Sequence, residues 1–105
     1  MNDLILLSTY KLLKDTFGDE LPEKYYEAVI VLMSEGLCHE NLIKAVGSFK
    51  NIGQDRVDCD YPKFLAKENM QKIQQTDEYH EAFTKLRDNG FFEWLEEPDF
   101  HVSDQ

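Results

Sequence analysis

The sequence has few cysteines, no long hydrophobic run and no basic segment at its N-terminus. Its 105 residues include two cysteines, Cys38 and Cys59, which is too few for the disulfide framework of a small secreted domain. No apolar stretch approaches the roughly 18 residues that a transmembrane helix needs. The first fifteen residues lack the basic stretch of a signal peptide. We therefore expect a cytoplasmic protein that does not enter a membrane and keeps its thiols reduced.

Basic residues are scarce. There are 11 lysines and arginines against 21 aspartates and glutamates, so the formal net charge is −10. This charge repels the phosphates of nucleic acids and anionic lipid surfaces, so we expect no direct binding to either. The imbalance grows along the chain, because residues 51–105 contain 13 acids and 6 bases and no base follows Arg87. We expect such a region to attract a protein partner with a basic surface, and solubility alone is the alternative explanation.

Motifs for catalysis and metal binding are also missing. The sequence has no glycine-rich phosphate loop and no G-x-S-x-G nucleophile motif. His-Glu pairs at positions 39 and 80 begin the zinc-protease motif H-E-x-x-H, but Ile43 and Thr84 stand where its second histidine is required. We therefore expect no enzymatic activity, metal or cofactor, and two cysteines that pack as small hydrophobic side chains. A metal-binding or enzymatic domain built on residues 38–40 and 58–60 is the alternative.

The residues that are present predict an all-α fold. Hydrophobic residues make up 42% of the chain, and apolar positions recur with helical spacing. The pattern predicts helices over residues 3–17, from about Pro22 to Gly36, and over 39–49. An irregular connection is expected over residues 50–60, followed by a helix that Asp60 caps, with Pro62 in its first turn, and by a helix that Thr76 or Asp77 caps. We expect one domain over residues 1–105, a compact irregular bundle of about five helices with a polar tail at 98–105.

Two segments resemble each other at an offset of 54 residues. Residues 23–37 (EKYYEAVIVLMSEGL) align with residues 77–91 (DEYHEAFTKLRDNGF). Both contain a leucine four residues before a glycine, and an apolar residue follows that glycine. This spacing is typical of a Schellman cap, in which the glycine adopts a positive φ. We therefore expect Gly36 and Gly90 to end two helices in the same way.

An aromatic and acidic segment follows the second of these glycines. The sequence FFEWL at residues 91–95 predicts a short helix, with a hairpin through the preceding Asp-Asn-Gly as the alternative. On a helix, Phe91, Trp94 and Leu95 have the spacing of anchors that enter a groove of a partner protein. The alternative is that these rings fill the chain's own core. The candidate partner-binding residues are Phe91, Trp94 and Leu95 together with the acids Glu93, Glu96, Glu97 and Asp99.

These observations predict a non-catalytic protein-interaction module. A bacterial or phage regulator, inhibitor or immunity-type protein would have this size, charge and lack of catalytic motifs. Its partner would present a basic or groove-like surface. A second hypothesis is an acidic mimic of nucleic acid that blocks a basic nucleic-acid-binding protein, which requires carboxylates arrayed on one face. The sequence leaves a homodimer open.

Overall fold

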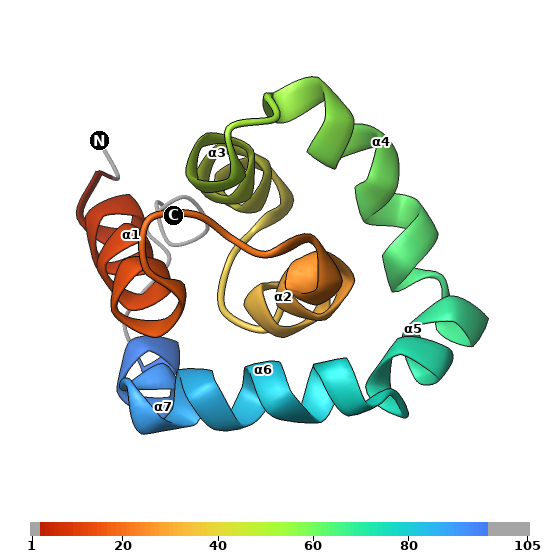
Figure 1. Cartoon of the computed structure of the whole chain (residues 1–105). Coiled ribbons are helices and arrows are strands. Elements are labelled where there is room, and N and C mark those ends of the chain that lie inside the picture. Colours follow the sequence, from red (N-terminus) through yellow and green to blue (C-terminus); the bar gives the residue numbers. More distant parts are fainter. Residues whose placement is uncertain (1–2, 97–105) are drawn as a thin grey trace.

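Helices account for nearly all of the chain that the computed structural model describes, residues 3–96. Within these residues there are seven α-helices, one 3-10 helix and no strand (Figure 1). The predicted all-α bundle is confirmed. The elements in chain order are α1 (Asp3–Phe17), η1 (Glu23–Tyr25), α2 (Tyr26–Met33), α3 (His39–Lys50), α4 (Gln54–Leu65), α5 (Lys67–Gln74), α6 (Asp77–Asp88) and α7 (Phe91–Leu95).

Helix α2 lies at the centre of the molecule. Seven of the eight residues in its sequence, YEAVIVLM, are buried, and Glu27 is the exposed one. A helix that is apolar on nearly every side must be covered almost all around. Helices α3, α4, α5 and α6 contact it and form the surrounding arc (Figure 1). Burying each large aliphatic side chain contributes about 1.5–3 kcal/mol, so α2 is the main source of hydrophobic stabilisation.

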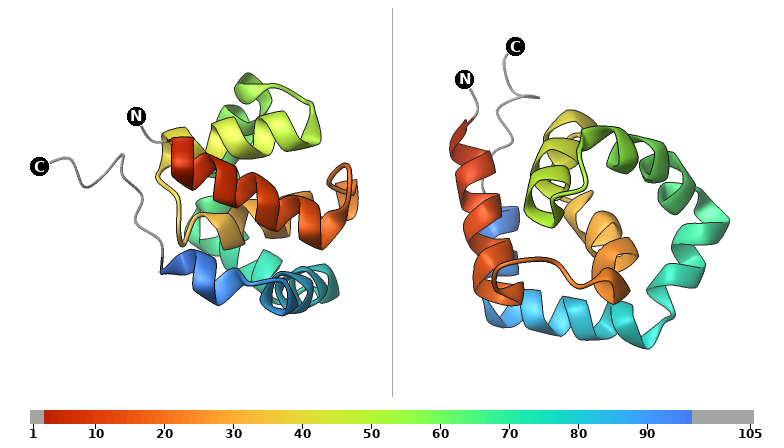
Figure 2. Two further views of the ribbon diagram at one scale, coloured as in Figure 1. Left: turned by 90° about the vertical axis from the view of Figure 1, so that its left-hand side faces the viewer. Right: turned by 45° about the horizontal axis from the view of Figure 1, so that its top comes forward.

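The surrounding helices bury one face each. In α4 the only fully buried side chain is Val57, and in α5 it is Ile73. These two helices form the outer arc on one side of α2, whereas α1 and α7 lie together on the other side (Figure 2). The α1–α7 end therefore belongs to a different face of the molecule from the polar α4–α5 arc.

The expected irregular connection over residues 50–60 is wrong. Helix α4 already begins at Gln54, after a short turn in which Asn51 and Gly53 have φ angles of +62° and +87°. The turn also requires Gly47, because a Cβ atom there would lie 2.9 Å from the carbonyl oxygen of Gly53. Segment 54–60 is helical because Val57, which is completely buried, packs into the core.

Pro62 and Asp60 also differ from the prediction. Pro62 is the ninth residue of α4 rather than part of a first turn. Because proline has no N–H, it removes one helical hydrogen bond, and the helix stops three residues later where Ala66 is extended (φ −60°, ψ 137°). The helix expected from Asp60 is thus divided into α4 and α5. Asp60 is no N-cap, since its carboxylate accepts a hydrogen bond from the Tyr26 hydroxyl at 2.8 Å.

The two similar segments end their helices differently. Gly90 has the expected positive φ of +104°, and its N–H donates to the Arg87 carbonyl. Gly36 does not have a positive φ, so the Schellman cap predicted there is wrong. Its glycine is required for another reason, because a Cβ atom would lie 2.7 Å from Cζ3 of Trp94. The predicted cap of α6 is confirmed, since the Thr76 hydroxyl accepts from the backbone N–H of Tyr79 at 3.1 Å.

None of the helices within residues 3–96 combines the length and the apolar character that crossing a membrane requires.

Candidate functional site at the C-terminal aromatic helix

The aromatic segment forms a helix, as the sequence favoured, and not the alternative hairpin. Helix α7 follows α6 directly through Gly90 and packs against α1 and α6. Its placement decides which of the candidate partner-binding residues are accessible.

Trp94 and Phe91 lie in the core. Trp94 is 4% exposed, and its indole N–H donates to the hydroxyl of the buried Thr9 at 2.9 Å. Phe91 is 1% exposed and stacks on the Trp94 ring at a centroid distance of 5.7 Å. The prediction that these two rings anchor a partner is therefore wrong for the folded chain, and the alternative that they fill its core is correct. They attach α7 to α1 and to the turn at Gly36.

Phe92 is the aromatic side chain that this helix leaves in solvent. It is 50% exposed, and Leu7 on α1 is 62% exposed; these are the two large hydrophobic residues that are exposed among the described side chains. The Phe92 ring lies 5.9 Å from those of Phe83 and Phe91. The sequence analysis missed Phe92, because the spacing of Phe91, Trp94 and Leu95 directed attention to the face that the core covers. A helical rotation of about 100° per residue turns Phe92 away from that face.

The other candidate residues divide into three groups. Glu93 and Glu96 are exposed. Leu95 is half-buried and packs beside Gly36. Glu97 and Asp99 lie outside the described residues. We call the exposed side chains of Leu7, Phe92, Glu93 and Glu96, together with the recess described next, the α1–α7 surface.

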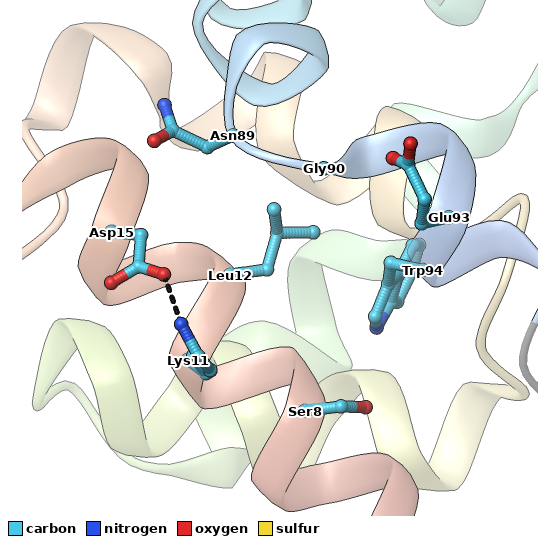
Figure 3. Close-up of a pocket in the computed structure, with 8 residues that line it drawn as sticks. All are labelled: Ser8, Lys11, Leu12, Asp15, Asn89, Gly90, Glu93 and Trp94. Carbon is cyan, nitrogen blue, oxygen red and sulfur yellow. Dashed lines mark hydrogen bonds and ion pairs between the residues drawn. The ribbon is translucent and has the colours of Figure 1, made fainter.

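A recess lies between α1 and the junction of α6 and α7 (Figure 3). Its volume is about 220 Å³. The buried side chains of Leu12 and Trp94 line its inner part, and polar side chains surround them. Lys11 and Asp15 form an ion pair of 2.6 Å at one side. The full lining consists of Ser8, Lys11, Leu12, Asp15, Asn89, Gly90, Glu93 and Trp94.

The alternative metal site is only partly assembled. His39 Nε2 lies 2.8 Å from Asp58 Oδ1, and the imidazole stacks on the Tyr61 ring at 4.3 Å. Cys38 caps α3, since its sulfur accepts from the backbone N–H of Asn41 at 3.5 Å. In the part of the chain that the structure describes, no group of three or more His, Cys, Asp and Glu side chains is arranged to hold a metal ion.

The two cysteines do not behave alike. Cys38 is partly buried, but Cys59 is exposed on α4. The expectation that both pack as small hydrophobic side chains is therefore wrong for Cys59. The two cysteines form no disulfide with each other.

A second polar network surrounds the hydroxyl of Tyr26. The hydroxyl donates to Asp60, while Arg56 and Lys50 lie over the ring at 5.1 and 5.7 Å. Glu23 pairs with Lys50 at 3.0 Å, and that hydrogen bond is the main cause that lowers the pKa of Glu23. Burial, reinforced by Asp60, raises the pKa of Tyr26. The tyrosine is thus a neutral donor that joins α2 to α4, which is a structural role rather than that of a nucleophile.

Comparison with known proteins does not assign the chain to a family. The sequence matches no protein-family model, and no curated protein or solved structure is significantly similar to it. The function proposed below therefore follows from the side chains of the α1–α7 surface and from their chemistry.

Proposed function

We propose that this chain is a non-catalytic protein-interaction module of the regulator, inhibitor or immunity type, and that its partner docks on the α1–α7 surface. The observation that carries the proposal is the exposure of Phe92, a ring that the folded chain leaves half in solvent although its neighbours Phe91 and Trp94 are buried. Aromatic side chains are enriched in the cores of protein interfaces. Leu7 adds a second exposed apolar side chain on the adjoining helix.

The backbone beneath Phe92 is fixed before any partner arrives. Trp94 is held by its hydrogen bond to Thr9 and by its stacking on Phe91, so helix α7 needs no ordering when it binds. Binding is stronger when less conformational freedom is lost on association. A preformed α7 therefore suits Phe92 to the role of an anchor.

The charges around this anchor favour a partner with a basic surface. Glu93 and Glu96 are exposed on the same helix, and no base follows Arg87 in the sequence. Complementary charge accelerates association and excludes partners of like charge. Two cysteines that form no disulfide are typical of a reducing compartment, so we propose that the protein works in the cytoplasm.

Mimicry of nucleic acid is less well supported. It needs carboxylates that are free to imitate phosphates, but several carboxylates of this chain pair with its own cationic side chains or with a histidine. These are Asp15, Glu23, Glu40, Asp58, Asp60 and Asp88. A mimic would lose its partner steeply as salt is raised, whereas an apolar anchor retains much of its affinity.

The test is affinity capture at low and high salt, followed by binding measurements with the purified partner. Phe92→Ser should weaken binding by at least about tenfold, the cost expected for an interface anchor, and leave the melting temperature nearly unchanged. His80→Ser is the matched control, because it removes an exposed ring about 15 Å further along α6 from Gly90. Wild-type affinity of the Phe92→Ser protein would refute the proposal.

A further inference from the structure

Building on the proposed function, we infer that the recess between α1 and the α6–α7 junction accepts one cationic side chain, an arginine or lysine, from the protein partner. Glu93, which follows Phe92 in α7, forms part of the lining, so the recess and Phe92 share this short helix. A partner that docks on α7 would therefore present one side chain to the recess and another residue to Phe92.

The size of the recess suits a single long side chain. A volume of about 220 Å³ lies below the roughly 300–1,000 Å³ of pockets that hold drug-sized ligands. The recess can therefore take a single side chain, and it is too small for a folded segment of a partner.

The inner part of the recess is apolar and rigid. Leu12 and Trp94 contribute it, and both are buried. The indole cannot swing away without losing its hydrogen bond to Thr9. Arginine and lysine bury their methylene stems on such apolar surfaces while the charged head stays among polar groups.

The polar side chains around the recess select a cation. Lys11 neutralises Asp15, with which it forms an ion pair. Glu93 adds a second carboxylate, so Lys11, Asp15 and Glu93 together give the lining a net charge of −1. Figure 3 shows Asp15 on α1 and Glu93 on α7 at opposite sides of Leu12, with the Asp15 carboxylate paired to Lys11. The negative lining disfavours an anion and attracts a cation more than a neutral group. One positive charge balances the site.

The sole tryptophan of the chain reports directly on this recess. We would titrate the protein with the blocked peptide acetyl-Gly-Leu-Arg-Leu-Gly-amide and follow Trp94 fluorescence at constant ionic strength. The same peptide with citrulline in place of arginine keeps the shape and removes the charge. We expect a saturable change with the arginine peptide and binding at least about tenfold weaker with citrulline, because charge-assisted hydrogen bonds are worth more than neutral ones.

Variants assign the effect to the recess. Glu93→Gln should weaken binding of the arginine peptide about tenfold, whereas Glu27→Gln, which removes an exposed carboxylate from α2, should leave it unchanged. Equal affinity for the arginine and citrulline peptides, no saturable change with either, or an unaffected Glu93→Gln protein would overturn the inference. Displacement of the peptide by spermidine at equal concentration would show a site for small amines and would also overturn it.

The outcome is separable from that of the proposed function. One result is that the captured partner binds the Glu93→Gln protein with wild-type affinity and the Phe92→Ser protein much more weakly. That result would support the interaction module and refute the cation site. The opposite result is that the recess binds the arginine peptide but the partner binds the Phe92→Ser protein as tightly as the wild type. That result would refute docking on the α1–α7 surface.

Discussion

Replacing Gly36 by alanine tests how tightly the aromatic helix is packed. The added Cβ would lie 2.7 and 2.8 Å from Cζ3 and Cη2 of Trp94. An isolated tryptophan ring could tilt to relieve this contact. Here the ring is hydrogen-bonded to Thr9 and stacked on Phe91, so moving it disturbs both interactions.

The expected magnitude follows from two opposing effects. Overpacking a core costs about 1–3 kcal/mol. The backbone at Gly36 has no positive φ, so alanine also restricts the unfolded chain and returns about 0.4–1 kcal/mol. The difference between these effects spans about 0–2.6 kcal/mol. Because the added Cβ would lie closer than 3.0 Å to two ring atoms, we expect the free energy of unfolding to fall by about 1–2 kcal/mol and the melting temperature by about 4–16 °C.

Urea unfolding measured by circular dichroism provides the assay, and a double-mutant cycle provides the control. Trp94→Phe removes the atoms that clash, so Gly36→Ala should cost nothing in that background. The reasoning is refuted if Gly36→Ala is as stable as the wild type, or if it costs the same in both backgrounds.

Three further predictions follow from contacts described above. Thr9→Val leaves the buried indole N–H of Trp94 without its acceptor, so the free energy of unfolding should fall by about 1–3 kcal/mol in urea titrations; an unchanged value would contradict the hydrogen bond. Val57→Ala should cost about 2 kcal/mol in the same assay, because its side chain is completely buried; a cost below about 0.5 kcal/mol would indicate that residues 54–60 are not packed. Tyr26→Phe should cost about 1–2 kcal/mol at pH 7, since it removes the hydrogen bond to Asp60. Because the pKa of Tyr26 is raised in the folded protein, Tyr26 of the unfolded chain ionises at a lower pH than that of the folded chain. The extra stability of the wild type is therefore present below pH 10 and declines as the pH rises beyond it. The free energies of unfolding of the two proteins should approach each other between pH 7 and 11, and a constant difference would contradict the hydrogen bond to Asp60.

Sequence periodicity predicted the helices that bury one clear stripe. Residues 3–17 form α1 as expected, and α6 begins after Thr76. For α2, periodicity predicted one apolar face, but it did not predict that seven of the eight residues are buried. It failed for α4, because a helix whose only fully buried side chain is Val57 has no sustained apolar repeat. Pro62 reinforced the error, since a proline inside a helix is uncommon enough to suggest a helix start.

The candidate site depended on contacts that the sequence does not encode locally. The acidic residues and the short helix were recognised, and Glu93 and Glu96 are exposed as a partner-binding role requires. Which rings face outward could not be read from spacing alone. It depends on Gly36, which leaves space for Trp94 from a position 58 residues earlier in the chain. Local spacing selected the more hydrophobic face of α7, and that is the face that the core covers.

The central position of α2 has a consequence for how the chain folds during synthesis. Helix α2 is complete by Met33, yet the helix that covers one side of it, α6, begins only at Asp77. The hydrogen bond between Thr9 and Trp94 joins residues 85 positions apart. While residues 77–95 are still inside the ribosome, the most apolar helix of the protein has no complete cover. Its nascent chain therefore depends on being kept from aggregation until the last helices emerge.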